Sequence, residues 1–220
     1  MLGMPWPTAS PTPAAPAIIG ETTEWLGAEE RLAARAGALG PKIRAAVERR
    51  EALAVAAGID LTGTNPSRTN IEGGLSTIEE KSLGAIAKAG RGPLAGLVPY
   101  GARPGTPGRI LMDAPAYAPE SVGGFVAAGA NLLMFTTGVG NSFGSRLAPT
   151  LKVTANAATA GRLTTQIDLD VSALAEGRED LDAAAARALS AVCAIASGGL
   201  TFSEIFMDGE ETISRFGEAL

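Results

Sequence analysis

A polar, glycine-rich stretch over residues 65–84 leads directly into a helix signal, and it reads NPSRTNIEGGLSTIEEKSLG. Gly73 and Gly74 allow close approach of the backbone, and the free amides of a helix N-terminus carry a partial positive charge. Ser76 and Glu79 have the spacing of a capping box that would begin this helix. The stretch therefore predicts an anion-binding site for a carboxylate or phosphate, with Lys81 either adding charge or pointing into solvent. An ordinary loop before an ordinary capped helix accounts for the same residues.

A second set of polar residues follows the strand-like segments of the second half of the chain. The segment TTGVGNSFGSR begins at Thr136, and a dinucleotide fingerprint is excluded because the next strand starts by Leu151 instead of a long helix. Ligands bind at the carboxyl ends of parallel strands, and this rim gathers hydroxyl, amide and carboxylate groups suited to a polyhydroxylated ligand. The binding candidates there are Thr136, Thr137, Gly138 and Asn156, with Asp113 beside them. The glycines serve equally well as turn formers.

Acidic residues form a third group of candidates. Glu29 and Glu30 are adjacent, with Glu21 and Glu24 upstream, and Asp168 and Asp170 alternate in IDLDV. Carboxylate oxygens can hold a hard divalent ion, so Glu29 and Glu30 are weak candidates for metal ligands. Adjacent glutamates on a helix also commonly face solvent.

The composition excludes several classes of protein. The 220 residues are 46% hydrophobic and 19% charged, carry a net charge of −5 and contain no histidine. Nucleic-acid binding needs clustered basic residues that are missing here, and the absence of histidine removes Ser-His and Cys-His catalysis. The single Cys193 lies in an apolar run and is predicted to be a buried thiol. The first twenty residues do not resemble a signal peptide and no apolar run is long enough to span a membrane, so we expect a cytoplasmic protein.

The elements that would position these residues are α-helices followed by strands. Helical patterns occupy 21–58, interrupted at Gly40-Pro41, and 77–89. Strand patterns follow in LAGLVPY, RILMDAP, NLLMFTTG and LKVTANA, with a helix in PESVGGFVAAG that would complete a βαβ unit. The last long helix, within 179–199, has an apolar stripe through Leu181, Ala185, Leu189 and Val192. The expected fold is α/β, a helical N-terminal part followed by a doubly wound, mainly parallel Rossmann-like sheet.

Three long segments resemble the altronate and galactarate dehydratase family. They are GETTEWLGAEE, NPSRTNIEGGLSTIEEKSLGAIAKAG and NLLMFTTGVGNSFGSRLAPTLKVTANAATA. The resemblance runs from about Ile19 to the C-terminus, and sulfolactate sulfo-lyase is similar to the same group. It implies a proline-rich tail over 1–18, part of the central dehydratase domain over 19–100 and the C-terminal α/β domain over 109–220.

The resemblance implies a lyase that removes water from a sugar acid to give a 2-keto-3-deoxy acid, with a divalent metal, iron or manganese, and no nucleotide. Lys81 and Glu29 are the catalytic candidates it suggests, Lys81 as base or electrostatic anchor. The substrate-binding candidates are Asn65, Ser67, Asn70, Gly73, Gly74 and Ser76, joined by the rim residues Thr136, Thr137, Gly138 and Asn156.

The chain also departs from the family pattern. It reads GAEE over 27–30 where the family has GAEH, and TTGVG over 136–140 where the family has TTGRG. Family members are much longer, so we expect a truncated chain or one subunit, a partner chain that supplies the N-terminal domain, and a homo-oligomer. The alternatives are a non-catalytic module that binds a sugar acid or serves assembly, and a nucleotide-binding protein that uses the glycine-rich rim.

Overall fold

The structure is a computed structural model that describes residues 16–59, 68–72, 74–90 and 92–211. The chain divides into two compact units between Gly129 and Ala130. We call residues 16–129 the N-terminal unit and residues 130–211 the C-terminal unit. The predicted boundary, in the glycine- and proline-rich turn over 101–108, is not where the units divide. The strand after that turn pairs with strands that precede it.

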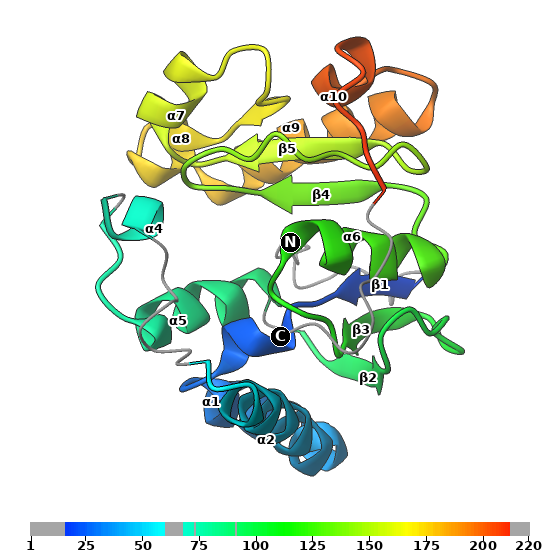
Figure 1. The fold of residues 1–220 in the computed structure, drawn as a ribbon. Helices are drawn as coiled ribbons and strands as arrows, with labels where there is room; N and C mark the ends of the chain where they lie inside the picture. The colour runs from blue at the N-terminus through cyan, green and yellow to red at the C-terminus, as the bar shows by residue number, and fades with distance from the viewer. Residues whose placement is uncertain (1–15, 60–67, 73, 91, 212–220) are drawn as a thin grey trace. The chain divides into compact units, whose positions relative to one another are not determined.

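A three-stranded parallel sheet organises the N-terminal unit, with the strand order β1-β3-β2 (Figure 1). The strands are β1 (Pro16–Ile19), β2 (Leu94–Val98) and β3 (Gly108–Met112). The predicted tail over 1–18 therefore overlaps β1, whose Pro16 opens an edge strand, a position that tolerates a residue without an amide hydrogen. The rest of that tail lies outside the described residues.

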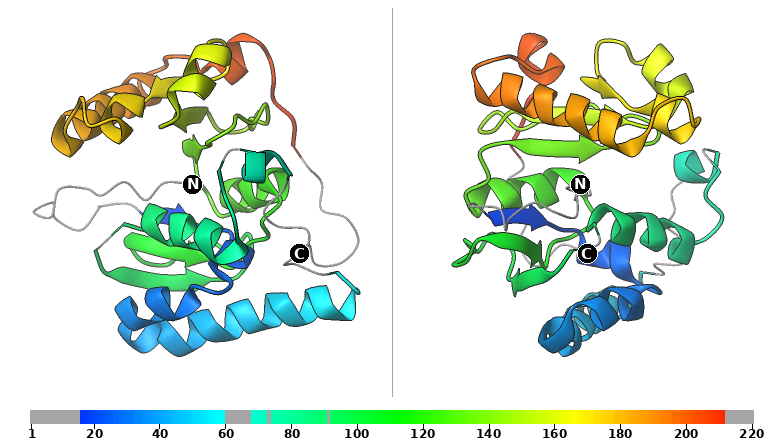
Figure 2. Two further views of the ribbon diagram at one scale, coloured as in Figure 1. Left: turned by 90° about the vertical axis from the view of Figure 1, so that its left-hand side faces the viewer. Right: turned by 180° about the vertical axis from the view of Figure 1, so that it is seen from behind.

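Helices fill most of the chain between β1 and β2, as the sequence predicts. They are η1 (Thr22–Trp25), α1 (Glu29–Arg35), η2 (Gly37–Leu39), α2 (Gly40–Ala56), α4 (Arg68–Glu72) and α5 (Ile78–Lys88). Pro41 lies in the first turn of α2, where its missing amide hydrogen costs nothing. Figure 2 shows α2 lying against α1.

Aliphatic side chains and one tryptophan form the core of the N-terminal unit. Trp25, Leu32, Ile43 and Leu111 are at most 1% exposed and belong to one cluster that joins η1, α1 and α2 to the sheet. A further helix, α6 (Ala118–Ala127), follows β3. The core fixes η1 against α5, and this contact positions the acidic residues described below.

A second parallel sheet, in the order β4-β5-β6, organises the C-terminal unit. Its strands are β4 (Leu133–Thr136), β5 (Thr150–Thr154) and β6 (Leu169–Asp170), and its helices are α7 (Ala157–Arg162), α8 (Ser172–Ala175), α9 (Leu181–Ala196) and α10 (Phe202–Ile205). All five residues of β5 are buried. Figure 2 shows α9 running beside this sheet.

The α/β class predicted from the sequence is confirmed, but the predicted βαβ unit is wrong. It required β3 and β4 to share a sheet, whereas β3 pairs with β1 and β2, and β4 pairs with β5. The described strands thus form two sheets instead of one doubly wound sheet.

The apolar stripe predicted on α9, which suits a core or a subunit interface equally, is not the face that the C-terminal unit buries. Ala184 and Ala188 are the buried residues of this helix, while Leu181 and Leu189 are 49% and 41% exposed. Cys193, predicted to be buried, is exposed as well, because it follows Leu189 by one helical turn. None of the helices in the described part of the chain is long and apolar enough to cross a membrane.

Candidate functional site

Two buried glutamates follow the carboxyl end of β1. Glu21 is 8% exposed and Glu24 is 7% exposed, and they are three residues apart on either side of the start of η1. Glu21 has a φ of 79°, in the left-handed region that non-glycine residues rarely adopt. Strained backbone of this kind concentrates at functional sites, where surrounding packing holds it in place. The carboxyl end of a parallel strand is also where α/β proteins bind ligands.

Two lysines of α5 compensate these carboxylates. Lys81 Nζ lies 2.7 Å from Glu24 Oε1, and the Lys81 side chain is 22% exposed. Lys88 is seven residues further along α5 and thus lies on the same side of the helix, half-buried. The α5 helix is held against η1 by the Ser82 hydroxyl, which donates to the Leu26 carbonyl at 2.7 Å. Glu21, Glu24, Lys81 and Lys88 form what we call the acid–lysine cluster.

The two carboxyl groups of the cluster have opposite pKa shifts. Burial, followed by the charge of Glu24, raises the pKa of Glu21 to about 8. Burial also disfavours the charged form of Glu24, but Lys88, Lys81 and the hydrogen bond with Glu21 outweigh it and hold the Glu24 pKa below its ordinary value. At neutral pH the cluster therefore contains a neutral carboxylic acid hydrogen-bonded to a carboxylate. Two neighbouring carboxyl groups with pKa values shifted in opposite directions are typical of active sites in which one acts as an acid and the other stays charged.

A second polar network adjoins the cluster through Thr22. Its hydroxyl donates to Asp113 Oδ1 at 2.8 Å and accepts the Ala114 amide at 3.1 Å. Arg50 Nε donates to the same Asp113 oxygen at 3.0 Å, and Arg49 bonds the other oxygen. Burial opposes ionisation of Asp113, but the hydrogen bonds from Arg49 and Thr22 and the charge of Arg50 outweigh it and lower its pKa. This network ties the residues after β1 to the carboxyl end of β3.

The predicted anion site before α5 is described only in part. Asn65, Ser67 and Gly73 lie outside the described residues, and Asn70 falls within α4. Gly74 is exposed with a φ of 102°.

The predicted capping box is displaced by one residue. Thr77, not Ser76, accepts the Glu80 amide, at 3.1 Å. Ser76 instead donates its amide and hydroxyl to the Glu80 carboxylate at 2.9 and 2.6 Å. The sequence places two hydroxyl residues before two glutamates, so the pattern fits either register, and the backbone selects the later one.

The two glutamates at the start of α1 have different surroundings. Both Glu30 oxygens are bound by exposed Arg44, at 2.5 and 2.7 Å. Glu29 is the first residue of α1, and its Oε2 is buried without a hydrogen-bond partner among the described residues. Glu29 therefore keeps an unused acceptor, whereas Glu30 is engaged in a surface ion pair.

Residues 12–218 match the family described as D-galactarate/altronate dehydratase, C-terminal. The chain belongs to this family. The predicted resemblance, and its restriction to the C-terminal region, are thereby confirmed.

Similar curated proteins carry three names. The chain is 32% identical over 212 residues, 92% of this chain and 53% of the relative, to (2R)-sulfolactate sulfo-lyase subunit beta of Chromohalobacter salexigens. It is 36% identical over 114 residues, 52% of this chain and 23% of the relative, to altronate dehydratase of Escherichia coli. It is 32% identical over 141 residues, 64% of this chain and 27% of the relative, to galactarate dehydratase (L-threo-forming) of Escherichia coli. The chain spans about half the length of the first of these relatives and about a quarter of the other two.

The glycine-rich segment by which the family was predicted lies in the C-terminal unit. The Thr137 hydroxyl accepts the Gly140 amide at 2.9 Å, and the Gly138 carbonyl accepts the Thr159 hydroxyl at 2.7 Å. Asn156 caps α7 by accepting two backbone amides. Thr136 ends β4, and its hydroxyl is buried without a partner among the described residues. Most of these rim groups therefore hold the loop together, and Thr136 alone of the four retains an unused buried hydroxyl.

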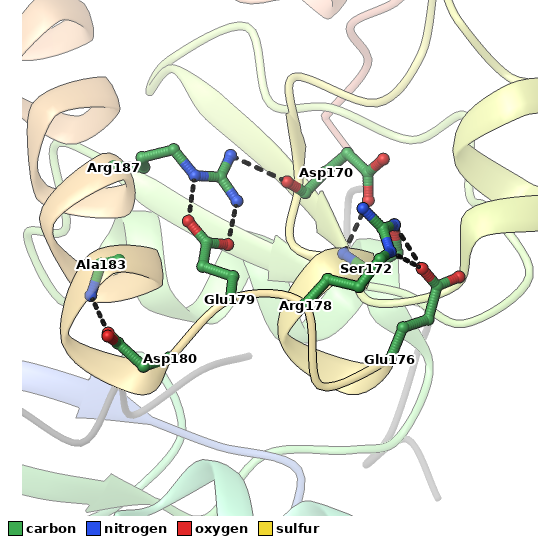
Figure 3. A network of polar contacts seen from close by, with 8 residues as sticks. All are labelled: Asp170, Ser172, Glu176, Arg178, Glu179, Asp180, Ala183 and Arg187. Atoms are coloured by element: carbon green, nitrogen blue, oxygen red, sulfur yellow. Dashed lines mark hydrogen bonds and ion pairs between the residues drawn. The ribbon is translucent and has the colours of Figure 1, made fainter.

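The aspartates of IDLDV are also engaged in backbone bonds. Asp168 accepts the amides of Lys152 and Phe202, each at 2.7 Å. Asp170 accepts the Ser172 amide at 2.7 Å, and Arg187 binds the Asp170 carbonyl and the Glu179 carboxylate (Figure 3). These contacts connect β6 to the helices that follow it.

The metal implied by the family resemblance has no site built from the described residues alone. Among them, no three His, Cys, Asp or Glu side chains gather closely enough to hold an ion. Glu21 and Glu24 are close together, but Lys81 and Lys88 supply the positive charge that a metal ion would supply beside Glu24. Dependence on iron or manganese stays a prediction.

Sequence reasoning noted Glu21 and Glu24 only as acidic residues upstream of Glu29, and it did not single out Lys88. The available signal was the spacing of two acids, three residues apart, directly after the apolar segment Pro16–Ile19. Nothing in the sequence indicates that these acids are buried, and burial is what changes their chemistry.

Proposed function

We propose that this chain is the part of a hydro-lyase that supplies an acid and an anion-binding cation for the dehydration of a hydroxylated carboxylic acid. The observation that carries the proposal is the burial of Glu21 and Glu24 at the end of β1, with Lys81 Nζ 2.7 Å from Glu24; this burial raises the pKa of Glu21 to about 8. The names of the relatives support the reaction class, since each is a dehydratase or a sulfo-lyase.

Dehydration breaks the C–H bond next to the carboxylate and the C–O bond of the neighbouring hydroxyl. A carbon–carbon double bond forms, and the enol rearranges to a 2-keto-3-deoxy acid. The departing hydroxyl must take up a proton to leave as water, and proton donation by a positioned acid accelerates such a step by about 10²- to 10⁴-fold. In this proposal Glu21 donates that proton, since its raised pKa keeps it protonated at neutral pH.

Lys88 binds the carboxylate of the substrate in this proposal. It lies close enough to Glu24 to lower the Glu24 pKa, but within the described part of the chain it makes no ion pair of 4 Å or less. Lys81 already pairs with Glu24, so it acts as an electrostatic anchor and not as the base. With Glu21 neutral, the two lysines outnumber the one ionised carboxylate, and a substrate carboxylate would balance the cluster.

The base that removes the proton next to the carboxylate is assigned to a partner segment. The relatives are longer than this chain, and one of them is named as a subunit, so the other half of the site would come from a second domain or chain. The substrate class is a sugar acid, by likeness to the two dehydratases. Sulfolactate, by likeness to the sulfo-lyase, would instead lose sulfite through its C–S bond.

The test is turnover by the purified chain, alone and with a candidate partner subunit, against altronate, galactarate and sulfolactate. Assays are anaerobic, with Fe(II) or Mn(II), and keto acid or sulfite is detected. Glu21→Gln is expected to abolish turnover and leave binding within about twofold. Lys88→Met is expected to weaken binding at least about tenfold, and Lys42→Met, at an exposed lysine of α2, is the matched control.

Three results would contradict the proposal. Turnover by Glu21→Gln equal to that of the unaltered chain would show that Glu21 is not the proton donor. Equal binding by Lys88→Met and Lys42→Met would remove the carboxylate site. Binding of a sugar acid without turnover under any of these conditions would favour a non-catalytic binding module.

A further inference from the structure

The loop before β5 forms a cradle of hydrogen-bond donors around a carboxylate. Arg146 N and Leu147 N donate to Glu211 Oε1 at 2.9 and 3.3 Å, and the Ser145 hydroxyl donates to the same oxygen. We call these three donors, over residues 145–147, the carboxylate cradle. Convergence of two successive backbone amides and a hydroxyl on one oxygen is the arrangement by which proteins bind anions without a basic side chain.

The Ser145 hydroxyl is fixed toward its acceptor. Ser145 is 4% exposed, and its oxygen already accepts the Ala148 amide at 3.2 Å and the Leu147 amide at 3.0 Å, so the Leu147 amide is shared between Ser145 and Glu211. Its own amide is held by the Thr150 hydroxyl at 3.1 Å. With its lone pairs occupied by these amides, the hydroxyl hydrogen is available to the carboxylate alone.

A buried lysine braces the loop that carries the cradle. Lys152 is 1% exposed, and its ammonium group donates to the Ser142 carbonyl at 2.9 Å and to the Ser203 hydroxyl at 2.8 Å. Gly144 packs against Ser203, and a Cβ at Gly144 would come within 2.7 Å of Ser203 Oγ. The loop that carries the cradle is thus held by packing in which the carboxylate takes no part, and preorganisation of this kind lowers the entropic cost of binding.

The backbone of the segment that delivers Glu211 is fastened separately. Gly209 forms a parallel bridge with Gly144, and the Glu210 amide donates to the Gly144 carbonyl at 3.1 Å. Arg146 also bonds the Gly209 carbonyl through its side chain. The Glu211 side chain can therefore leave the cradle while these backbone contacts remain.

We propose that the carboxylate cradle is a binding subsite for a carboxylate ligand, and that Glu211 is an internal occupant that such a ligand replaces. The cradle lies at the amino end of β5, whereas Thr136 and Asn156 lie at the carboxyl ends of β4 and β5. It is therefore separate from the predicted rim, and it does not depend on the acid–lysine cluster. A tethered occupant competes at an effective concentration in the millimolar range, so the unaltered chain binds external carboxylates weakly.

The test is titration of the ¹⁵N-labelled full chain with sodium acetate, which presents the same carboxylate as a glutamate side chain. In Glu211→Ala, the amide resonances of Arg146 and Leu147 are expected to shift saturably, at acetate concentrations at least about tenfold below those needed in the unaltered chain. Glu210→Ala, which changes the exposed neighbour and keeps the occupant, is expected to behave as the unaltered chain. Ser145→Ala combined with Glu211→Ala is expected to weaken acetate binding.

The proposal would be overturned by the absence of a saturable shift in Glu211→Ala, or by equal shifts with chloride at the same ionic strength. If Glu211→Ala does not fold, Glu211→Gln gives the same test, since the neutral amide is a weaker occupant than the carboxylate. Acetate affinity in Glu211→Gln no higher than in the unaltered chain would then refute competition.

Discussion

Substitution of Glu21 by glutamine tests the electrostatics of the acid–lysine cluster through stability alone. Glutamine has nearly the same shape, can donate to Glu24 and carries no charge at any pH. The folded protein holds a proton on Glu21 up to about pH 8, whereas the unfolded chain loses it near 4.5. A raised pKa of this kind contributes stability that is fully present below the unfolded value and is lost as the pH rises through the folded value.

The magnitude follows from the two pKa values. The interval between 4.5 and about 8 corresponds to roughly 5 kcal/mol lost from the free energy of unfolding between pH 4.5 and pH 8. Glu24 has a lowered pKa, so its contribution to the free energy of unfolding is lost only as the pH falls below the pKa that it has in the unfolded chain, outside this interval. The stability of Glu21→Gln relative to the unaltered chain should therefore rise with pH across the interval by several kcal/mol.

The assay is urea denaturation between pH 5 and pH 9, followed by tryptophan fluorescence. Trp25 is 1% exposed and next to Glu24, so it reports unfolding of the unit that holds the cluster. A Trp6→Phe background leaves Trp25 as the single emitter. Glu51→Gln, at an exposed position of α2, is the control and should show no trend. A stability difference between Glu21→Gln and the reference that stays constant from pH 5 to pH 9 would refute the reasoning.

Four further substitutions, one of them a control, test the packing that supports the two sites. Gly20→Ala places a Cβ 2.2 Å from Phe125 Cζ and should lower the free energy of unfolding by about 1–3 kcal/mol. The control is Gly84→Ala, at a helical position with nothing within 4 Å, which should raise it by up to about 1 kcal/mol. Equal effects of the two substitutions in thermal denaturation would argue against close packing at Gly20. Thr77→Ala removes the cap of α5 and should cost about 1 kcal/mol by urea denaturation, with no loss expected had Ser76 been the cap. Lys152→Met leaves the Ser203 hydroxyl and the Ser142 carbonyl without their donor and should destabilise the C-terminal unit by about 1–3 kcal/mol. Amide hydrogen exchange measures this loss, and unchanged protection of the β5 amides would count against the bracing role of Lys152.

The site could be predicted only in its parts. Lys81 was a candidate because it follows the start of a helix, and GETTEW lies in a segment that resembles the family; the structure brings the two together through the Lys81–Glu24 ion pair. The cradle of residues 145–147 was not visible, because its donors are mostly backbone amides that any sequence possesses. The partner glutamate is more than sixty residues away in the chain.

The sequence by itself determined the local elements. Pro41 marks the start of α2 and Asp180 caps α9, because helix ends depend on side chains only a few residues away. Only the tertiary structure decided which strands share a sheet and which face of α9 is buried. An alanine-rich helix is apolar on several sides, so its pattern leaves the buried face open, as Leu189 and Cys193 show. Only the tertiary structure sets the pKa of Glu21, because the largest cause of its shift is burial, and burial depends on how the whole unit packs.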